Sequence, residues 1–369
     1  MDKVKVGIVG CGNISGIYFK NMQQVFEILE VKACADLDMD RARAKATENP
    51  GVVPMTVDQL MADPEIRIVV NLTVPKAHAS VAMRAVESGK SVHNEKPLTL
   101  TRDEGKALLK AAKAKKVLVG AAPDTFMGAG IQTCRKLIDD GVIGVPVAAT
   151  AFMMCRGHEG WHPDPEFYYE KGGGPMFDMG PYYLTALVNL IGPVTRVQGS
   201  ARISFPTRTI TSQKKNGKVI PVDVPTHVAG VMDFANGAVG TIVTSFDVCR
   251  HHLPCIEIHG SEGSLQVPDP NGFGGEPLLF RRGAQDWEAV TLTRPYAENS
   301  RGIGVADMAY SLLRKRRPHR CSSKLAYHVL DLMHAFHDAS DKGKAVKVKS
   351  SCEQPPVLPA DLKPGQLDA

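Results

Sequence analysis

The chain has 369 residues, 43% of them hydrophobic and 22% charged, which is typical of a soluble globular protein with two domains. Its 44 basic and 39 acidic residues nearly balance, so the net charge of +5 does not indicate a nucleic-acid partner. The eight cysteines form no Cys-x-x-Cys pair, no apolar run reaches the roughly 20 residues of a membrane span, and the first residues lack a signal-peptide pattern. We therefore expect a cytoplasmic protein without a membrane partner.

The first third of the chain alternates between strand and helix patterns. Buried strands are expected at residues 4–9, 31–36, 66–74, 91–93 and 117–122. Helices are expected at residues 17–30, 39–49, 56–63, 78–89 and 103–115. This alternation predicts a doubly wound parallel sheet of the α/β class, and we place a dinucleotide-binding Rossmann domain at residues 1–122.

The remaining residues, 123–369, have a different character and are expected to form an α+β domain for substrate binding and oligomerisation. The stretches 145–155 and 196–290 are rich in Thr, Val and glycine-punctuated runs, and Asn236-Gly237 predicts a hairpin. Helices are expected at residues 131–141, 176–191 and 322–340, the last beginning after Ser322 or Ser323 as N-cap. We expect this last helix to pack back on the first domain. The Pro-rich final twenty residues are expected to be extended.

A glycine-rich loop follows the first strand. Gly10 permits a tight turn and Gly12 allows the backbone to approach a pyrophosphate, while Ser15 stands at the third glycine position. Asp36 ends the second strand, where a carboxylate can bind the ribose hydroxyls and repel a 2′-phosphate. The spacing predicts an NAD site, although arginines in the following helix pattern leave NADP as an alternative.

The segment "HNEKPL" (93–98) places charged residues at the carboxyl end of a buried strand, where ligands of doubly wound sheets bind. Pro97 restricts the backbone of Lys96 and so sets the direction of its side chain locally. The ammonium of Lys96 could stabilise negative charge on a substrate oxygen beside the nicotinamide. The alternative is a surface ion pair between Lys96 and Glu95, and the residues alone leave both open.

A second cluster, "EKGGGPMFDMGPYY", covers residues 170–183. Three consecutive glycines indicate a close approach by the main chain, and Asp178 and Tyr182 are four residues apart on one helix face. Tyr182 could transfer a proton if a cation such as Lys96 lowers its pKa, with Asp178 orienting the substrate. Pro181 indicates a kink or a first helical turn. The alternative is that Tyr182 is a core residue.

Two further segments contain polar and aromatic residues. In "RGHEGWHPDPEFYY" (156–169), we expect Arg156, His158, Trp161 and His162 to contact a sugar, since aromatic rings and polar groups commonly bind sugars from loops. The alternative is a packed loop anchored by Trp161. The segment "CRHHLPCIEIH" (249–259) offers metal-binding atoms, but its spacing matches no standard zinc pattern, so we expect no metal.

Together, "VGIVGCGNIS", "HNEKPL" and "GGGPMFDMGPYYL" resemble the glucose–fructose oxidoreductase/inositol dehydrogenase family (Gfo/Idh/MocA) over nearly the whole chain. The resemblance implies a Rossmann domain followed by an open-faced, mostly antiparallel sheet with helices on one face. It implies that Lys96 is the catalytic lysine and Asp178 a substrate contact. Tyr182 stands where many members have histidine, and Asp124 lies where many relatives have other polar residues, which makes it a candidate sugar contact.

The resemblance also implies which residues bind the cofactor and what the protein does. We expect the cofactor to contact the following residues: Gly10, Gly12, Asn13, Ile14, Asp36, Thr73, His78, Glu95 and Lys96. The expected function is NAD(P)-dependent oxidation or reduction of a sugar, glycoside or inositol-like polyol. The alternatives are an NAD-retaining enzyme that cleaves glycosides by transient oxidation and elimination, and a non-catalytic nucleotide sensor. A homo-oligomer, a dimer or tetramer, is expected to form through the open sheet.

Overall fold

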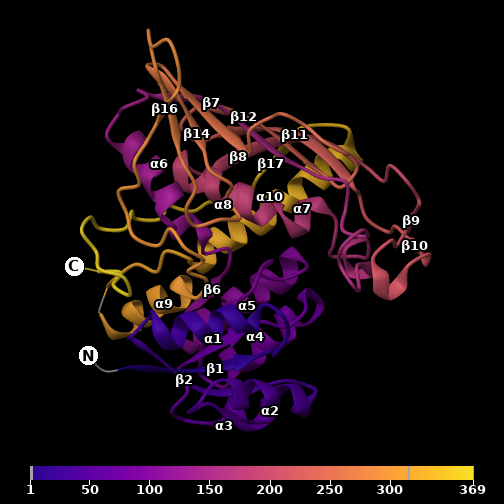
Figure 1. Cartoon of the computed structure of the whole chain (residues 1–369), viewed down its shortest axis with the longest axis vertical. Helices are drawn as coiled ribbons and strands as arrows, with labels where there is room; N and C mark the ends of the chain where they lie inside the picture. The colour runs from indigo at the N-terminus through magenta and orange to yellow at the C-terminus, as the bar shows by residue number, and fades with distance from the viewer. Residues whose placement is uncertain (1–2, 315, 369) are drawn as a thin grey trace.

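The computed structural model describes residues 3–314 and 316–368, so Lys315, which belongs to the basic segment "RKRRPHR" at residues 314–320, lies outside the described residues. Two large β-sheets organise the chain, one near each end of the long axis, with helices between and around them (Figure 1). The N-terminal third forms the lower sheet and its helices, and the remainder forms the upper sheet with its helices. The functional cleft lies where these two parts meet.

The lower sheet has six strands, all parallel, in the order β3-β2-β1-β4-β5-β6. Its strands are β1 (Val4–Val9), β2 (Leu29–Ala35), β3 (Val53–Pro54), β4 (Ile68–Asn71), β5 (Ser91–Asn94) and β6 (Val119–Ala121). The helices of this part are α1 (Ser15–Gln24), α2 (Met39–Glu48), α3 (Val57–Ala62), α4 (His78–Glu87) and α5 (Arg102–Lys115). All residues of β4 and β5 are buried, as expected for central strands covered on both faces, so the predicted doubly wound sheet is confirmed.

The first helix differs from its prediction at both ends. α1 begins at Ser15, because the chain turns directly into the helix after the glycine loop, and it ends at Gln24. The apolar residues predicted to complete it instead lead into β2, which begins at Leu29 and pairs with β1 from Val4 onwards. An apolar run at a helix–strand junction fits either element, so its periodicity did not locate the boundary.

The upper sheet has nine strands in the order β16-β15-β14-β13-β7-β12-β11-β8-β17. They are β7 (Pro146–Met154), β8 (Val194–Arg202), β11 (His227–Phe234), β12 (Val239–Ser245), β13 (Ile256–Gly260), β14 (Gly263–Val267), β15 (Leu278–Arg281), β16 (Glu288–Ala289) and β17 (Val346–Lys347). All neighbouring pairs are antiparallel except β7 and β12, and the predicted hairpin at Asn236-Gly237 joins β11 to β12. A small hairpin of β9 (Thr207–Thr209) and β10 (Val219–Pro221) projects beside the sheet (Figure 1).

Helices cover one face of the upper sheet and leave the other open, as the family resemblance implied. They are α6 (Ala129–Asp139), α8 (Gly180–Leu190) and α10 (Ser323–Lys342). The predicted helix at 176–191 is divided at Met179 into α7 (Pro175–Asp178) and α8, with Pro181 in the first turn of α8. Ser322 is the N-cap of α10, its hydroxyl accepting a hydrogen bond from the amide of Leu325.

One helix was not predicted. α9 (Ile303–Leu313) lies beside α1 at the junction of the two parts (Figure 1). Its residues are apolar on nearly every side, so they lack the alternation of an amphipathic helix, and its first eight residues are all buried. Among the helices of the described residues, none is both long and apolar enough to cross a membrane.

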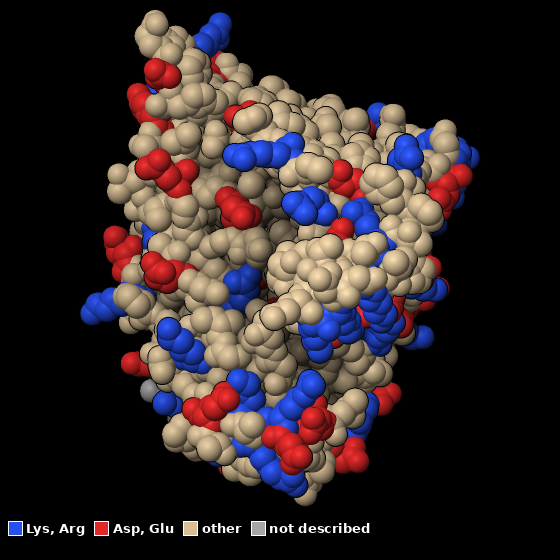
Figure 2. Space-filling view, turned by 45° about the vertical axis from the view of Figure 1, so that its right-hand side comes forward, with Lys and Arg blue, Asp and Glu red and all other residues tan. Residues whose placement is uncertain are grey.

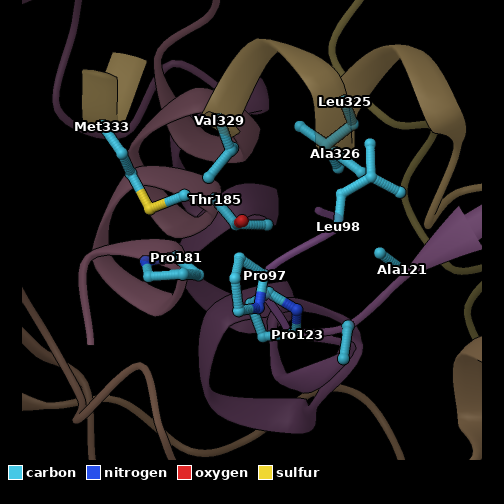
Figure 3. Close-up of a pocket in the computed structure, with 11 residues that line it drawn as sticks. Pro97, Leu98, Ala121, Pro123, Pro181, Thr185, Leu325, Ala326, Val329 and Met333 are labelled. Atoms are coloured by element: carbon cyan, nitrogen blue, oxygen red, sulfur yellow. The ribbon is translucent and has the colours of Figure 1, made fainter. Parts of the chain in front are cut away.

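α10 contacts the first part of the chain. Arg102, at the start of α5, forms ion pairs with Asp331 (2.6 Å) and Asp338 (2.9 Å) of α10. Figure 3 shows Pro97, Pro123 and Pro181 facing side chains of α10 around a small cavity of about 10 Å³, large enough for at most about one water molecule. This packing fixes the backbone on either side of the junction, next to Lys96 and Tyr182.

Candidate active site

A cleft of about 610 Å³ separates the two parts of the molecule, a size suited to a nucleotide and a small substrate. Figure 2 shows that the surface is hollowed between them, with basic and acidic side chains intermixed around it. The lining residues come from the glycine loop, the end of β4, the segment after β5, the loop before α7, and α8. Those that the sequence predicted are Gly12, Asn13, Ile14, Thr73, Glu95, Lys96, Asp178 and Tyr182.

The two loop glycines have different structural requirements. Gly10 has φ of 103°, and a Cβ there would lie 2.6 Å from the carbonyl carbon of Leu72, so any side chain would be strained and would clash. A Cβ on Gly12 would meet nothing within 4 Å. Gly10 is therefore required by the fold, whereas the free space at Gly12 opens on the cleft and suits the approach of a ligand. The third position is filled by buried Ser15, whose hydroxyl donates a hydrogen bond to the carbonyl of Gly12 (2.6 Å).

The start of α1 and the end of β2 fit the rest of a dinucleotide. No side chain caps α1, and its first turn carries no acidic residue, so its amide groups remain available for phosphate. The carboxylate of Asp36 is fixed by the amides of Cys11 (2.8 Å) and Asp38 (3.0 Å).

Lys96 lies at the end of β5 and contacts the second part of the chain. Its Nζ donates hydrogen bonds to Oδ1 of Asp178 (2.7 Å) and to the Asp178 backbone carbonyl (2.8 Å). Burial alone would lower the pKa of Lys96, but Asp178 and Tyr182 raise it above its usual value. Glu95 does not pair with this ammonium at salt-bridge distance. Its carboxylate accepts hydrogen bonds from the Tyr18 hydroxyl (2.8 Å) and from the Lys96 amide (2.9 Å).

Asp178 lies between a cation and an imidazole. While Oδ1 binds Lys96, Oδ2 lies 3.4 Å from Nε2 of His158. Burial would raise the pKa of Asp178, but Lys96 and His158 lower it to about 2, so the group is a carboxylate at neutral pH. The His158 ring packs against Tyr168 and Phe246, with centroids 4.1 and 4.6 Å away, and so approaches Asp178 from behind the cleft lining.

Tyr182 completes the cluster on α8. The Nζ of Lys96 lies 5.5 Å from the centre of its ring. Burial raises the pKa of Tyr182, and the positive charges of Lys96 and Arg301 oppose this effect. The phenol therefore holds its proton at neutral pH, and its ionised form depends on nearby cations. Arg301, which comes from the segment before α9, was not selected from the sequence.

Two predicted residues occupy other positions. The ring nitrogens of fully buried His78 lie 2.7 Å from the Pro97 carbonyl and 2.9 Å from the Thr73 carbonyl, so His78 supports the loop that carries Lys96 and does not line the cleft. Asp124 is also buried, and its carboxylate accepts hydrogen bonds from the amides of Gly302 (2.9 Å) and Gly304 (3.1 Å). It binds the N-terminus of α9 because unpaired amides there need an acceptor.

The loop at 156–169 reaches the cleft with other residues than expected. Arg156 and Trp161 are exposed, Trp161 by 63%, and neither lines the cleft. His162 is half-buried and does not line the cleft either; its Nδ1 accepts a hydrogen bond from the Asp164 amide (3.1 Å). The lining residues from this region are instead Phe167, Tyr168, Lys171, Gly172, Gly173 and Phe177. The glycine triplet was the sequence signal for this close approach.

Lys76 and Glu170 connect the two walls at the mouth of the cleft through an ion pair of 2.6 Å. Both side chains are largely exposed, so the pair contributes little to stability, but it joins the loop before α7 to the segment after β4. Within the described residues, no group of three or more His, Cys, Asp or Glu side chains could hold a metal ion, including the segment 249–259.

Comparisons with known proteins agree with this geometry. Residues 4–122 match the family described as "Oxidoreductase family, NAD-binding Rossmann fold", and residues 131–266 match the "GFO/IDH/MocA C-terminal domain". The chain is 28% identical to levoglucosan dehydrogenase of Pseudarthrobacter phenanthrenivorans over 293 residues, 72% of this chain and 73% of that protein. It is 24% identical to scyllo-inositol 2-dehydrogenase (NADP(+)) IolW of Bacillus subtilis over 271 residues, covering 72% and 69%. A solved structure of levoglucosan dehydrogenase in complex with NADH and levoglucosan has the same fold, with a TM-score of 0.80, 22% identity and coverage of 95% and 100%.

Proposed function

The chain belongs to the Gfo/Idh/MocA family of NAD-binding oxidoreductases, and we propose that it moves a hydride between a nicotinamide and a secondary alcohol or keto carbon of a sugar or polyol. The observation that carries this proposal is the cluster of Lys96, Asp178 and Tyr182 in a cleft whose other wall is a glycine loop. The substrate class follows from the relatives, which act on an anhydrosugar and an inositol by name.

The cofactor would bind along the six-stranded sheet. Gly12 and the first turn of α1 would hold the pyrophosphate, and Asp36 would bind the adenosine ribose. Ile14 and Thr73 would contact the nicotinamide half of the dinucleotide, which reaches Lys96. When bound, the dinucleotide supplies the hydride acceptor or donor. Because Asp36 already accepts two backbone hydrogen bonds as a carboxylate, a 2′-phosphate there would be repelled, which favours NAD over NADP.

The three clustered side chains would share the work on the substrate oxygen. Lys96 remains an ammonium and stabilises negative charge that develops on that oxygen during hydride transfer. Tyr182 exchanges a proton with the same oxygen, as donor when a ketone is reduced and as acceptor when an alcohol is oxidised. Asp178 holds Lys96 through Oδ1 and positions the substrate hydroxyls at the cleft wall.

A substrate screen tests this function. Levoglucosan, scyllo-inositol, myo-inositol and D-glucose are each incubated with NAD⁺ or NADP⁺, and the absorbance of the reduced nicotinamide is followed. We expect net NADH formation with at least one of them, at a rate that is lower by about 10²–10³-fold in Lys96→Met. Absence of NADH from a broad panel of sugars and polyols, with cofactor still bound, would refute the dehydrogenase. Cleavage of a glycoside without net NADH would identify the elimination mechanism instead.

We also propose that the open face of the nine-stranded sheet joins copies of this chain. Val231 of β11 and Val239 of β12 are 38% and 46% exposed on this face, and on the same face Val243 of β12 pairs with Phe152 of β7. Light scattering after gel filtration should give a multiple of the chain mass that decreases in Val231→Glu and not in Val219→Glu, which is on the separate small hairpin. A monomeric parent protein would contradict the proposal.

A further inference from the structure

The imidazole of His158 lies beside the carboxylate of Asp178, although His158 itself does not line the cleft. Its Nε2 is 3.4 Å from Oδ2 of Asp178, and the two side chains are only 12% and 15% exposed. Within the described residues, no other carboxylate oxygen lies within 4 Å of the ring nitrogens. The ammonium of Lys96 binds the opposite oxygen, Oδ1, at 2.7 Å. Lys96 and His158 therefore face the two oxygens of one buried carboxylate.

Both ring nitrogens of His158 lack a hydrogen bond. They are shielded from solvent, and neither is bonded to another group of the described residues. Two other buried histidines, His78 and His328, each bond through both nitrogens. His93 lacks partners as well, but within the described part of the chain no carboxylate oxygen lies within 4 Å of its nitrogens. A buried polar group without a partner is costly, so an imidazole beside Asp178 costs stability that an apolar ring of similar size would not.

The chemistry of the two groups determines how they can interact. Asp178 is a carboxylate, whose oxygens only accept hydrogen bonds, and an imidazole always has at least one N–H to donate. The distance of 3.4 Å between Nε2 and Oδ2 exceeds the range of about 2.7–3.2 Å for a formed hydrogen bond. Catalytic hydrogen bonds often shorten to that range when the substrate binds. A small movement of either side chain is therefore enough to form this bond.

The backbone of His158 is anchored by its own loop and by the small hairpin. Its amide donates a hydrogen bond to the Tyr169 hydroxyl (3.3 Å), which in turn donates one to the carboxylate of Glu159. Arg208 of β9 binds the other oxygen of Glu159 (3.0 Å). Gly157 has φ of 92°, and a Cβ there would lie 2.5 Å from the Tyr169 hydroxyl, so the chain before His158 is fixed as well. These contacts hold the imidazole beside the carboxylate.

We propose that His158 is a positioning residue of the active site, which holds Oδ2 of Asp178 through its Nε2–H group. The proposal rests on the proposed function. With Lys96 on one oxygen and His158 on the other, the carboxylate cannot rotate, and its remaining lone pairs keep one direction for a substrate hydroxyl. Hydride transfer needs the reacting atoms to be aligned, so a carboxylate that turns freely would bind the substrate in less productive orientations. His158 exchanges no proton with the substrate in this role.

Two variants separate this role from packing. His158→Phe keeps a ring against Tyr168 and Phe246 but removes the nitrogens, whereas His158→Gln removes the ring and keeps an amide that can donate to Asp178. With the sugar of the substrate screen that turns over fastest, kcat/KM should fall about 10- to 100-fold in His158→Phe, as for the loss of a hydrogen bond to a charged group. His158→Gln should recover part of this loss, although it should unfold at a lower urea concentration than His158→Phe. NADH affinity, from fluorescence titration, should be nearly unchanged in both.

The dependence on Asp178 is tested in a second background. In Asp178→Asn, the change His158→Phe should lower kcat/KM much less than in the parent protein, because the carboxylate that His158 positions is gone. The control is His259→Phe in β13, which removes an imidazole that lies 3.9 Å from the carboxylate of Glu257. This variant should leave kcat/KM unchanged.

Three kinetic results would overturn the proposal: a parent-like kcat/KM in His158→Phe, a lower kcat/KM in His158→Gln than in His158→Phe, or an equal loss in both backgrounds. Urea denaturation tests the contact without turnover. The double variant His158→Phe/Asp178→Asn should be more stable than the sum of the two single losses predicts, and additive losses would also overturn the proposal. Absence of turnover by the parent protein on any sugar of the screen would instead count against the proposed function.

Discussion

Replacing Lys96 with methionine removes an ammonium while keeping an unbranched chain that still fills the space. The lost charge leaves Asp178 as a buried carboxylate without its cation, because the two groups are 2.7 Å apart and only 19% and 15% exposed. Removing one partner of a buried pair costs about 3–5 kcal/mol, and His158 remains near the other oxygen, so we expect a loss near 3 kcal/mol in the free energy of unfolding. Losing one donor to the reacting oxygen should separately lower kcat by about 10²–10³-fold.

The matched variants are Asp178→Asn and the double variant Lys96→Met/Asp178→Asn, compared by urea denaturation. If the pair is coupled as its geometry indicates, the double variant should be more stable than the sum of the two single losses predicts. An interaction energy below about 0.5 kcal/mol would refute this reasoning, since independent sites are additive within that limit. NADH affinity, measured by fluorescence titration, should be nearly unchanged, and a loss parallel to that of kcat would contradict the assigned role.

Lys96→Met should also reverse the pH dependence of the contribution that Asp178 makes to stability. In the parent protein the pKa of Asp178 is lowered from 3.8 to about 2, so its stabilising contribution is present above pH 3.8 and is lost as the pH falls through about 2. Without Lys96, burial dominates and raises this pKa. Asp178 then stabilises the folded state below pH 3.8, and this contribution is lost as the pH rises through its raised pKa. The urea midpoint of Lys96→Met should therefore approach that of the parent as the solution is acidified from neutral pH.

Further variants separate the requirements of the fold from those of the ligand. Gly12→Ala should fold normally and bind NADH more weakly. Gly10→Ala should unfold at a lower urea concentration, because only the methyl group added at residue 10 would clash within the protein. Equal urea midpoints would contradict this. Asp36→Ala should weaken NADH binding and reduce the preference over NADPH in titrations of both cofactors, and an unchanged preference would rule out its role. Burial raises the pKa of Asp124 to about 6, so the contribution of this group to stability is present below pH 3.8 and is lost as the pH rises through about 6. As the pH rises from 3.8 to 6, the urea midpoint of Asp124→Asn should therefore fall less than that of the parent protein. Parallel plots of the two midpoints against pH would contradict the raised pKa.

The sequence predicted those parts of the fold and site that depend on short segments. The glycine loop, the Glu-Lys-Pro segment and the Asp-x-x-x-Tyr spacing each identify residues through local chain geometry, and these residues line the cleft. Strand alternation likewise identified the parallel sheet, because strands buried on both faces have nearly continuous apolar runs. α9 was missed for the converse reason: a helix buried on all sides has no polar face to mark its period.

The residues missed at the site depend on contacts between distant segments. Tyr18 reaches Glu95 across 77 positions, and the Asn21 side chain binds the carbonyl of Arg301 across 280 positions. No local pattern encodes such pairs. In the sequence, Arg301 is one arginine among many, and only the structure shows that its guanidinium binds the side chains of Asn271 and Asn299.

The direction of a polar side chain is the feature that sequence patterns fix least, and His158 illustrates why this matters for function. As a loop residue it was expected to contact a sugar. The hydrogen bond between the amide of His158 and the Tyr169 hydroxyl, together with the ring contacts to Tyr168 and Phe246, instead turns the imidazole towards Oδ2 of Asp178. Both oxygens of Asp178 therefore face protein groups, one a fixed cation and the other an imidazole. A substrate hydroxyl that binds Asp178 must share an oxygen with one of them, so the loop influences the reaction through this carboxylate.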